Sequence, residues 1–156
     1  MTQNRTTILY AEDDENDVFF MKRAFAKGRR PEQLVIVRDG QKAVNYVLGR
    51  AEFADRSAHP LPGLILLDIK MPQLTGIEAL RAFRADAGSQ AIPVVLLTSS
   101  TQESDIAEAQ LLQANGYFVK PSDATELIEL LQSLSAIYQS SGGAGSYSSI
   151  KGNRLS

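Results

Sequence analysis

The chain has 156 residues, of which 44% are hydrophobic and 22% are charged, and its formal net charge is -2. This size and composition favour one globular domain with its own core over a disordered chain or two ordinary domains. The balanced charge gives no general basis for binding nucleic acid or a membrane surface, and the lack of cysteine excludes disulfide scaffolds, thiolate zinc sites and thiol catalysis.

The first residues, MTQNRTTILYAEDDE, do not have the pattern of a secretory signal. Their apolar stretch is only about five residues long and runs directly into acidic residues. No apolar run approaches the roughly 20 residues that a membrane-spanning helix needs. The sequence therefore predicts a soluble, cytoplasmic protein.

Short apolar runs alternate along the chain with segments of helical periodicity. The runs are too short for helices and nearly free of charge, as is typical of strands buried on both faces of a parallel sheet. They span residues 8–11, 34–37, 64–67, 94–97 and 117–119. The helical segments between them span residues of about 15–28, 40–49, 76–85, 102–113 and 123–138.

Local signals support these helices. Thr75 with Glu78, and Ser100 with Glu103, have the spacing of capping boxes. The last helix carries a stripe of leucines at i, i+3, i+4 and i+7, which predicts a face packed on the core. The stripe consists of Leu127, Leu130, Leu131 and Leu134.

Alternating strands and helices predict a parallel sheet with helices on both faces. With right-handed crossovers, the natural choice is a flavodoxin-like doubly wound (βα)5 fold with strand order 2-1-3-4-5. We expect one domain over residues 1–138, with a long polar loop at 49–63. The Ser- and Gly-rich residues 139–156 predict a tail that is flexible or ordered by a partner, and no output domain.

Polar residues follow four of the predicted strands directly. In an open parallel sheet these positions share the carboxyl edge, where ligands bind. They are Glu12, Asp13 and Asp14 after the first strand, Asp68 after the third, Thr98 and Ser99 after the fourth, and Lys120 after the fifth.

Three carboxylates at one edge would repel one another unless a cation were present. Mg²⁺ prefers oxygen ligands, which Asp13, Asp68 and a backbone carbonyl near Lys70 can supply. Such an ion would also neutralise an incoming phosphoryl group. Lys120 can then pair with one phosphate oxygen and the Thr98 hydroxyl can donate to another, while an aspartate can accept the phosphoryl group covalently.

Each of these residues also has an ordinary structural interpretation. Asp14 or Asp17 can be the N-cap of the first helix, and an isolated Asp after a strand is more often a cap or turn residue than a nucleophile. Thr98 alone would be a turn hydroxyl, and Lys120 alone would be a surface lysine. The combination at matching strand ends is what favours a functional site.

These residues resemble the receiver domain of two-component response regulators over about residues 6–138. The matching strings are residues 8–14 (ILYAEDD), 66–72 (LLDIKMP) with Gly76, 95–99 (VLLTS) and 116–121 (GYFVKP). The resemblance implies that Asp68 is the phosphoacceptor, and that Glu12, Asp13, Asp68 and the backbone carbonyl of Lys70 hold Mg²⁺. It further implies that Thr98 and Lys120 contact the phosphoryl group, that Thr98 and Tyr117 form the switch, and that the Lys120–Pro121 bond is cis.

The resemblance also implies partners. The loop before the third predicted strand and the segment TSSTQESDI are similar to stand-alone regulators paired with phytochrome-type histidine kinases. We expect a histidine kinase as phosphodonor, a downstream protein or phosphotransfer partner, a possible homodimer, and no direct DNA binding. The sequence departs from the common pattern at Glu12, where many members have Asp, at Lys70, and at Ser122, where Phe is frequent.

Three other functions fit the sequence less well. A phosphohydrolase of the haloacid dehalogenase type needs an acid two residues after the nucleophile, where this chain has Lys70. A flavodoxin-like FMN carrier needs a Ser-, Thr- and Gly-rich phosphate loop after the first strand, where this chain is acidic. A receiver-fold module that works without phosphorylation remains the alternative, although nothing would require the full acid, Thr and Lys set on a scaffold. The predicted protein is a switch rather than a turnover enzyme.

Overall fold

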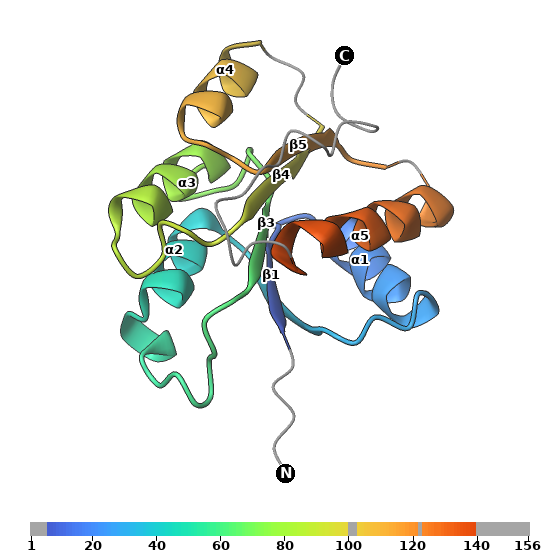
Figure 1. Ribbon diagram of the computed structural model, residues 1–156, viewed down its shortest axis with the longest axis horizontal. Helices are drawn as coiled ribbons and strands as arrows, with labels where there is room; N and C mark the ends of the chain where they lie inside the picture. Colours follow the sequence, from blue (N-terminus) through green and yellow to red (C-terminus); the bar gives the residue numbers. More distant parts are fainter. Residues whose placement is uncertain (1–5, 100–102, 122, 140–156) are drawn as a thin grey trace.

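The computed structural model describes residues 6–99, 103–121 and 123–139, and it arranges them around a five-stranded parallel sheet (Figure 1). The strand order is β2-β1-β3-β4-β5, so the predicted flavodoxin-like fold is confirmed. The strands are β1 (Thr7–Ala11), β2 (Gln33–Val37), β3 (Leu64–Leu67), β4 (Val94–Thr98) and β5 (Gly116–Val119).

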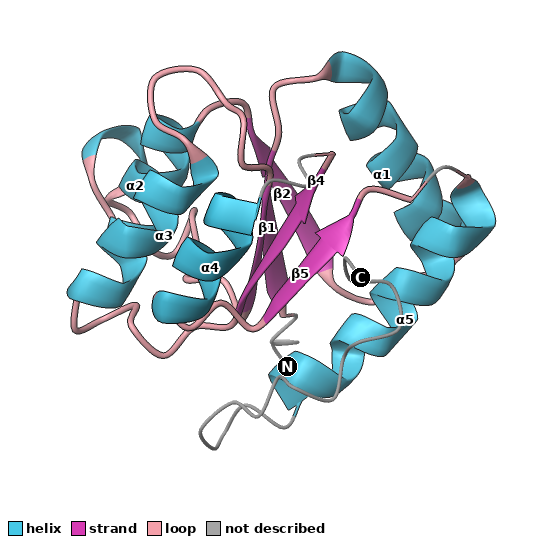
Figure 2. Ribbon diagram, turned by 90° about the horizontal axis from the view of Figure 1, so that it is seen from above, coloured by secondary structure: helices cyan, strands magenta, loops and turns pink. Residues whose placement is uncertain are grey.

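Helices cover both faces of the sheet. Helices α1 and α5 lie on one face, and α2, α3 and α4 lie on the other (Figures 1 and 2). The helices are α1 (Glu15–Lys27), α2 (Gly40–Leu48), α3 (Gly76–Ala85), α4 (Glu103–Leu111) and α5 (Ala124–Gln139). Each matches a predicted segment with its ends within two residues. Within the part of the chain that the structure describes, no helix is both long and apolar enough to cross a bilayer.

The central strands are apolar on both faces because both faces are covered. Successive side chains of a strand point to opposite faces. In β1, Leu9 therefore packs in the core beneath α2 and α3, whereas Ile8 packs in the core beneath α1 and α5. The leucine stripe predicted for the last helix is buried in the second of these cores, which confirms its structural interpretation.

Side chains fix the start of two helices next to the strand ends. The Asp14 carboxylate accepts a hydrogen bond from the backbone N–H of Asp17 at 3.0 Å and caps α1. Thr75 and Glu78 form the predicted capping box at α3. The second predicted box depends on Ser100, which lies outside the described residues, as do Ser122 and the tail from residue 140.

The long connection between α2 and β3 is packed against α2. It contains a short 3-10 helix (Ala51–Phe53), and the Arg56 guanidinium donates to the backbone carbonyl of Tyr46 at 2.8 Å. The ring of His59 packs edge-on against the rings of Tyr46 and Phe53, with centroids 5.8 and 5.1 Å away. His59 thus lies within the long loop that the sequence predicts at residues 49–63.

Helix α4 ends earlier than its sequence pattern predicts. The prediction extended it to residue 113, but the helix stops at Leu111 and Gln113 adopts a left-handed backbone with φ of 61°. Arg84 on α3 explains part of this ending, because its guanidinium donates to the carbonyls of Leu112 and Gln113, both at 3.1 Å. One arginine therefore ties the end of α4 to α3.

Candidate functional site

The residues that follow the strands are brought together by backbone hydrogen bonds at the carboxyl edge of the sheet. The Asp68 N–H donates to the Ala11 carbonyl at 3.1 Å, which places the end of β3 beside the end of β1. The Lys120 N–H donates to the Thr98 carbonyl at 2.9 Å, which places the end of β5 beside the end of β4. Because β3 also pairs with β4, the ends of all four strands lie at one edge of the sheet, as the strand order predicts.

Three carboxylates lie at the centre of this site. Glu12, Asp13 and Asp68 each offer an oxygen, and these oxygens lie within 4.8 Å of one another. Glu12 and Asp68 are buried, whereas Asp13 is exposed. The Oδ1 atom of Asp68 is buried and has no hydrogen-bond partner. An unpartnered buried carboxylate oxygen is costly, and it indicates a position that is completed by a ligand.

Gly76 sets the position of the loop that carries Asp68. Its N–H donates to the Ile69 carbonyl at 2.8 Å, so the start of α3 is held directly against the chain after β3. A Cβ atom at residue 76 would lie only 2.2 Å from the Asp68 carbonyl oxygen. The close approach therefore requires glycine.

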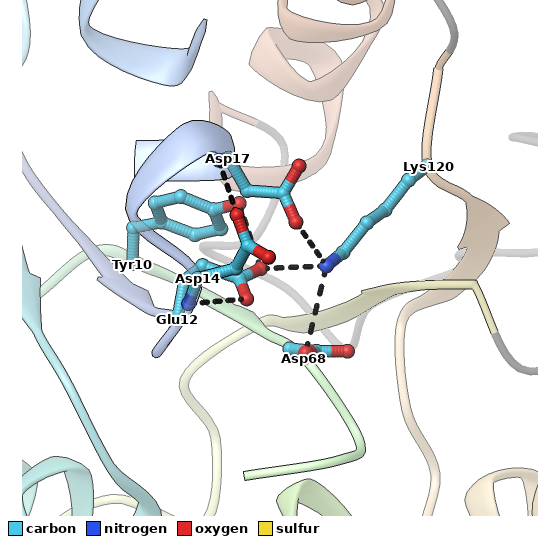
Figure 3. Close-up of polar contacts among 6 residues, drawn as sticks. All are labelled: Tyr10, Glu12, Asp14, Asp17, Asp68 and Lys120. Carbon is cyan, nitrogen blue, oxygen red and sulfur yellow. Dashed lines mark hydrogen bonds and ion pairs between the residues drawn. The ribbon is translucent and has the colours of Figure 1, made fainter. Parts of the chain in front are cut away.

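Lys120 reaches into the site from the end of β5 (Figure 3). Its Nζ atom lies 2.6 Å from Asp17 Oδ2, 2.9 Å from Glu12 Oε1 and 3.5 Å from Asp68 Oδ2. Burial lowers the pKa of Lys120, but the hydrogen bonds to Asp17 and Glu12 and the charges of Asp68 and Glu12 together raise it above its ordinary value. The lysine is therefore a fixed positive charge among carboxylates.

Glu12 is held by hydrogen bonds on both carboxylate oxygens. Oε1 accepts from the Tyr10 hydroxyl at 3.1 Å, and Oε2 accepts from the Asp14 backbone N–H at 3.2 Å. Burial raises the pKa of Glu12 to about 7; the hydrogen bond from Lys120 opposes this rise and the charge of Asp68 adds to it. Burial and the Glu12 charge also raise the pKa of Tyr10, so its hydroxyl stays protonated and donates.

The other predicted site residues lie around this cluster. Thr98 is fully buried at the end of β4. Tyr117 on β5 is half-buried and packs against the core on the α2 and α3 side of the sheet. Lys70 is exposed, two residues beyond Asp68. Thr98 and Tyr117 thus lie on adjacent strands, where Thr98 pairs with Val119 and Tyr117 pairs with Leu96.

The prediction of a cis bond between Lys120 and Pro121 is wrong, because this bond is trans in the structure. Among the described peptide bonds none is cis, and this one is included. An X-Pro bond prefers trans by only about 0.5–1 kcal/mol, so the sequence motif alone does not decide the isomer. The ion pairs of Lys120 are made with the trans bond.

The donor set fits Mg²⁺. Three carboxylates supply the hard oxygen ligands that this ion prefers, and a divalent cation would offset their mutual repulsion. The unpartnered Asp68 Oδ1 is an oxygen available for such a ligand. Magnesium therefore suits the residues that the structure brings together.

Asp17 and Tyr10 are site residues that the sequence interpretation missed. The sequence predicted Asp17 only as a helix cap. In the structure the cap is Asp14, which accepts a hydrogen bond from the Asp17 N–H, and the Asp17 carboxylate binds Lys120. The sequence predicts Tyr10 as part of a buried strand and predicts no partner for its hydroxyl. Its position two residues before Glu12, on the same face of the chain, was the available signal.

Comparison with known proteins identifies the relatives of this chain. Response regulator Rcp1 from Synechocystis sp. (strain ATCC 27184 / PCC 6803 / Kazusa) is 29% identical over 131 residues, covering 84% of this chain and 87% of Rcp1. A solved structure of Rcp1 in its Mn²⁺-bound form has a TM-score of 0.74 at 28% identity and covers 86% of this chain and 95% of that one.

Two further solved structures are similar. Response regulator RPA3017, described in red light signaling of R. palustris, has a TM-score of 0.79 at 33% identity and covers 88% of this chain and 96% of that one. The phosphorylated cyanobacterial phytochrome response regulator RcpA has a TM-score of 0.77 at 31% identity, covering 87% and 95%. The predicted similarity to phytochrome-associated regulators is confirmed.

Residues 8–132 match the family described as the response regulator receiver domain. The match includes β2 to β5, all of β1 except Thr7, and the acidic edge described above. The chain therefore belongs to the response regulator receiver domains, a family of signalling proteins rather than enzymes.

Proposed function

We propose that this protein accepts a phosphoryl group on Asp68 from a histidine kinase, with Mg²⁺, and signals to a partner protein by a change in shape. The observation that carries the proposal is the state of the Asp68 carboxylate. Its Oδ1 atom is buried without a hydrogen-bond partner, and its Oδ2 atom lies 3.5 Å from the Lys120 ammonium.

The proposed step is a displacement at phosphorus. A carboxylate oxygen of Asp68 attacks the phosphorus of a phosphohistidine and forms an O–P bond, while the N–P bond breaks. The imidazole leaves with the electron pair of that bond and takes up a proton from solvent. Lys120 and the Thr98 hydroxyl then contact oxygens of the phosphoryl group on Asp68.

Glu12, Asp13, Asp68 and the backbone carbonyl of Lys70 are the proposed ligands of Mg²⁺. The bound ion would neutralise charge on the transferred phosphoryl group. The three clustered carboxylates and the Mn²⁺-bound form of the relative Rcp1 support a divalent cation here.

Thr98 and Tyr117 are the proposed switch. The added negative charge on Asp68 would draw Thr98 and Lys120 toward it and repack Tyr117 and the surface near α4 and β5. The receiver domain would span residues 1–138, with residues 139–156 as a tail for partner contacts. The similarity to phytochrome response regulators supports a phytochrome-type kinase as the phosphodonor. A cytoplasmic location and a homodimer are further parts of the proposal.

Labelling with acetyl phosphate tests the acceptor. With Mg²⁺, intact mass spectrometry is expected to show one added phosphoryl group, and none after Mg²⁺ is chelated. Asp68→Asn should not be labelled, whereas Asp55→Asn, which changes an exposed loop aspartate, should be labelled like the parent protein. A folded protein that neither acetyl phosphate nor a cognate kinase labels would instead support a phosphorylation-independent module.

Lys120→Ala separates labelling from signalling. The Asp68 carboxylate remains in this variant, so some labelling is expected. The Lys120 ammonium that would contact the phosphoryl group is absent. Hydrogen exchange at the α4 and β5 backbone should then respond to phosphorylation in the parent protein and not in the variant. An equal response in both proteins would remove Lys120 from the proposed switch.

A further inference from the structure

Asp17 makes the shortest of the ion pairs of Lys120. Its Oδ2 atom lies 2.6 Å from Nζ and joins α1 to a residue 103 positions later in the chain (Figure 3). The cap of α1 does not need this carboxylate, because Asp14 accepts the hydrogen bond from the Asp17 N–H. The Asp17 carboxylate therefore pairs with Lys120 and is not needed as the hydrogen-bond cap of α1.

The hydrogen-bond donors of Lys120 are largely taken in this structure. An ammonium has three N–H donors, and carboxylates of Asp17 and Glu12 lie at hydrogen-bonding distances of 2.6 and 2.9 Å. Asp68 is the most distant of the three partners, at 3.5 Å. For Lys120 to contact a phosphoryl group on Asp68, as the proposed function requires, at least one of the two shorter pairs must lengthen.

The two partners differ in how readily they can release the lysine. The Glu12 side chain has 0% exposure and is also bound by Tyr10 and Asp14, so its carboxylate cannot be solvated in place of the lysine. The Asp17 side chain is 34% exposed, and water can replace the ammonium there. Lys120 would therefore leave Asp17 and keep Glu12.

We propose that Asp17 is a positioning residue that holds Lys120 in the unphosphorylated protein and competes with the phosphoryl group for it. This inference rests on the proposed phosphorylation of Asp68. Its consequence is that Asp17 weakens the phosphorylated state. Removing the Asp17 charge should free Lys120 and stabilise a phosphoryl group, or an analogue of it, on Asp68.

The test is the affinity for beryllofluoride, a phosphoryl analogue, formed from beryllium and fluoride salts and titrated by calorimetry at saturating Mg²⁺. Asp17→Asn is expected to bind it about two- to fivefold more tightly, the range for a partly exposed ion pair. Asp17→Glu, which restores the charge, should return the affinity toward that of the parent protein. If Asp17 had only a structural role, its substitution would weaken the binding of beryllofluoride instead.

Two controls isolate the effect of Lys120. Glu15→Gln removes a charge from the same turn of α1, but Glu15 pairs with Arg38 and not with Lys120, so its affinity should match the parent protein. In the Lys120→Ala background, Asp17→Asn should no longer tighten binding, because the residue through which Asp17 acts is absent.

The outcomes distinguish the inference from the proposed function. A folded parent protein that is labelled by neither acetyl phosphate nor a cognate kinase, and that does not bind beryllofluoride, would overturn both. A parent protein that binds beryllofluoride, with a folded Asp17→Asn that binds it equally or more weakly, would overturn the role of Asp17 alone. That role would also be overturned if Glu15→Gln, or Asp17→Asn in the Lys120→Ala background, showed the full increase.

Discussion

At the residue scale, the surroundings of the buried Glu12 side chain oppose its ionisation. Its side chain has no solvent exposure, and it shares the site with Asp68. The Lys120 hydrogen bond compensates only in part, and the pKa remains raised to about 7. We therefore expect Glu12 to make the stability of the metal-free protein depend on pH near neutrality.

The sign of this effect follows from linkage. The pKa of Glu12 is higher in the folded chain than its ordinary value of 4.5, so the folded state binds the proton more tightly. The resulting stabilisation is complete below pH 4.5 and is lost as the pH rises through about 7. We predict that this loss contributes up to about 3 kcal/mol to the fall in unfolding free energy of the metal-free protein.

Urea unfolding at several pH values, with the parent protein and Glu12→Gln in chelator, measures this contribution. The variant should lack the loss between pH 4.5 and 7, and saturating Mg²⁺ should reduce the loss in the parent protein because a cation favours the carboxylate. Parallel pH profiles for the two metal-free proteins would contradict the burial argument for Glu12.

The sequence predicted that Glu12, Asp13 and Asp68 share the site. It did not predict that Asp17 joins them or which acids pair with Lys120. Glu12, Asp13, Asp68 and Lys120 follow strands, and strand order alone brings strand ends together. The choice of Asp17 as a partner for Lys120 depends on the direction of α1 and on the rotamer of a long side chain. Those are set by tertiary packing, which local sequence patterns do not encode.

At the element scale, the start of α3 supports the acceptor loop. The capping box of Thr75 and Glu78 fixes where the helix begins, and Gly76 allows its first turn to touch the backbone of Asp68. Local signals were sufficient to predict the box. The reason for glycine was not visible in the sequence, because it lies in a contact between two backbone segments.

Gly76→Ala tests this contact. The added Cβ would meet the Asp68 carbonyl oxygen at 2.2 Å, so either α3 or the acceptor loop must move. We predict that the unfolding free energy falls by about 1–3 kcal/mol, as for other overpacked sites, and that labelling of Asp68 slows. Gly88→Ala is the control, since its Cβ would meet only the Asp86 side chain, at 3.2 Å. Equal stability and labelling of the two variants would show that the close approach is unimportant.

Sequence patterns did not predict the arginine side chains that bind backbone carbonyls at helix ends from distant positions in the chain. Arg84 binds carbonyls beyond the end of α4, and Arg56 binds carbonyls at the end of α2. Each arginine is separated in sequence from the helix end it satisfies, so the usual local end signals are absent. The hydrogen bonds from Arg84 account for part of the error in the predicted end of α4.

At the scale of the whole molecule, the fold was predictable because the central strands are buried on both faces. Apolar runs and leucine stripes then determine the layers, and right-handed crossovers leave few topologies. The same arrangement gathers the ends of β1, β3, β4 and β5 at one edge. We infer that a single residue at this edge, Asp68, takes the phosphoryl group.

Chemical mapping of the phosphorylated residue can decide this point. Protein labelled with acetyl phosphate and Mg²⁺ would be treated with borohydride, which reduces an aspartyl phosphate to homoserine, and its peptides would be sequenced by mass spectrometry. We predict homoserine at position 68 alone, with none when Mg²⁺ is chelated. Homoserine at position 13 or 17, or a labelled protein with aspartate intact at position 68, would contradict the assignment of Asp68 as the acceptor.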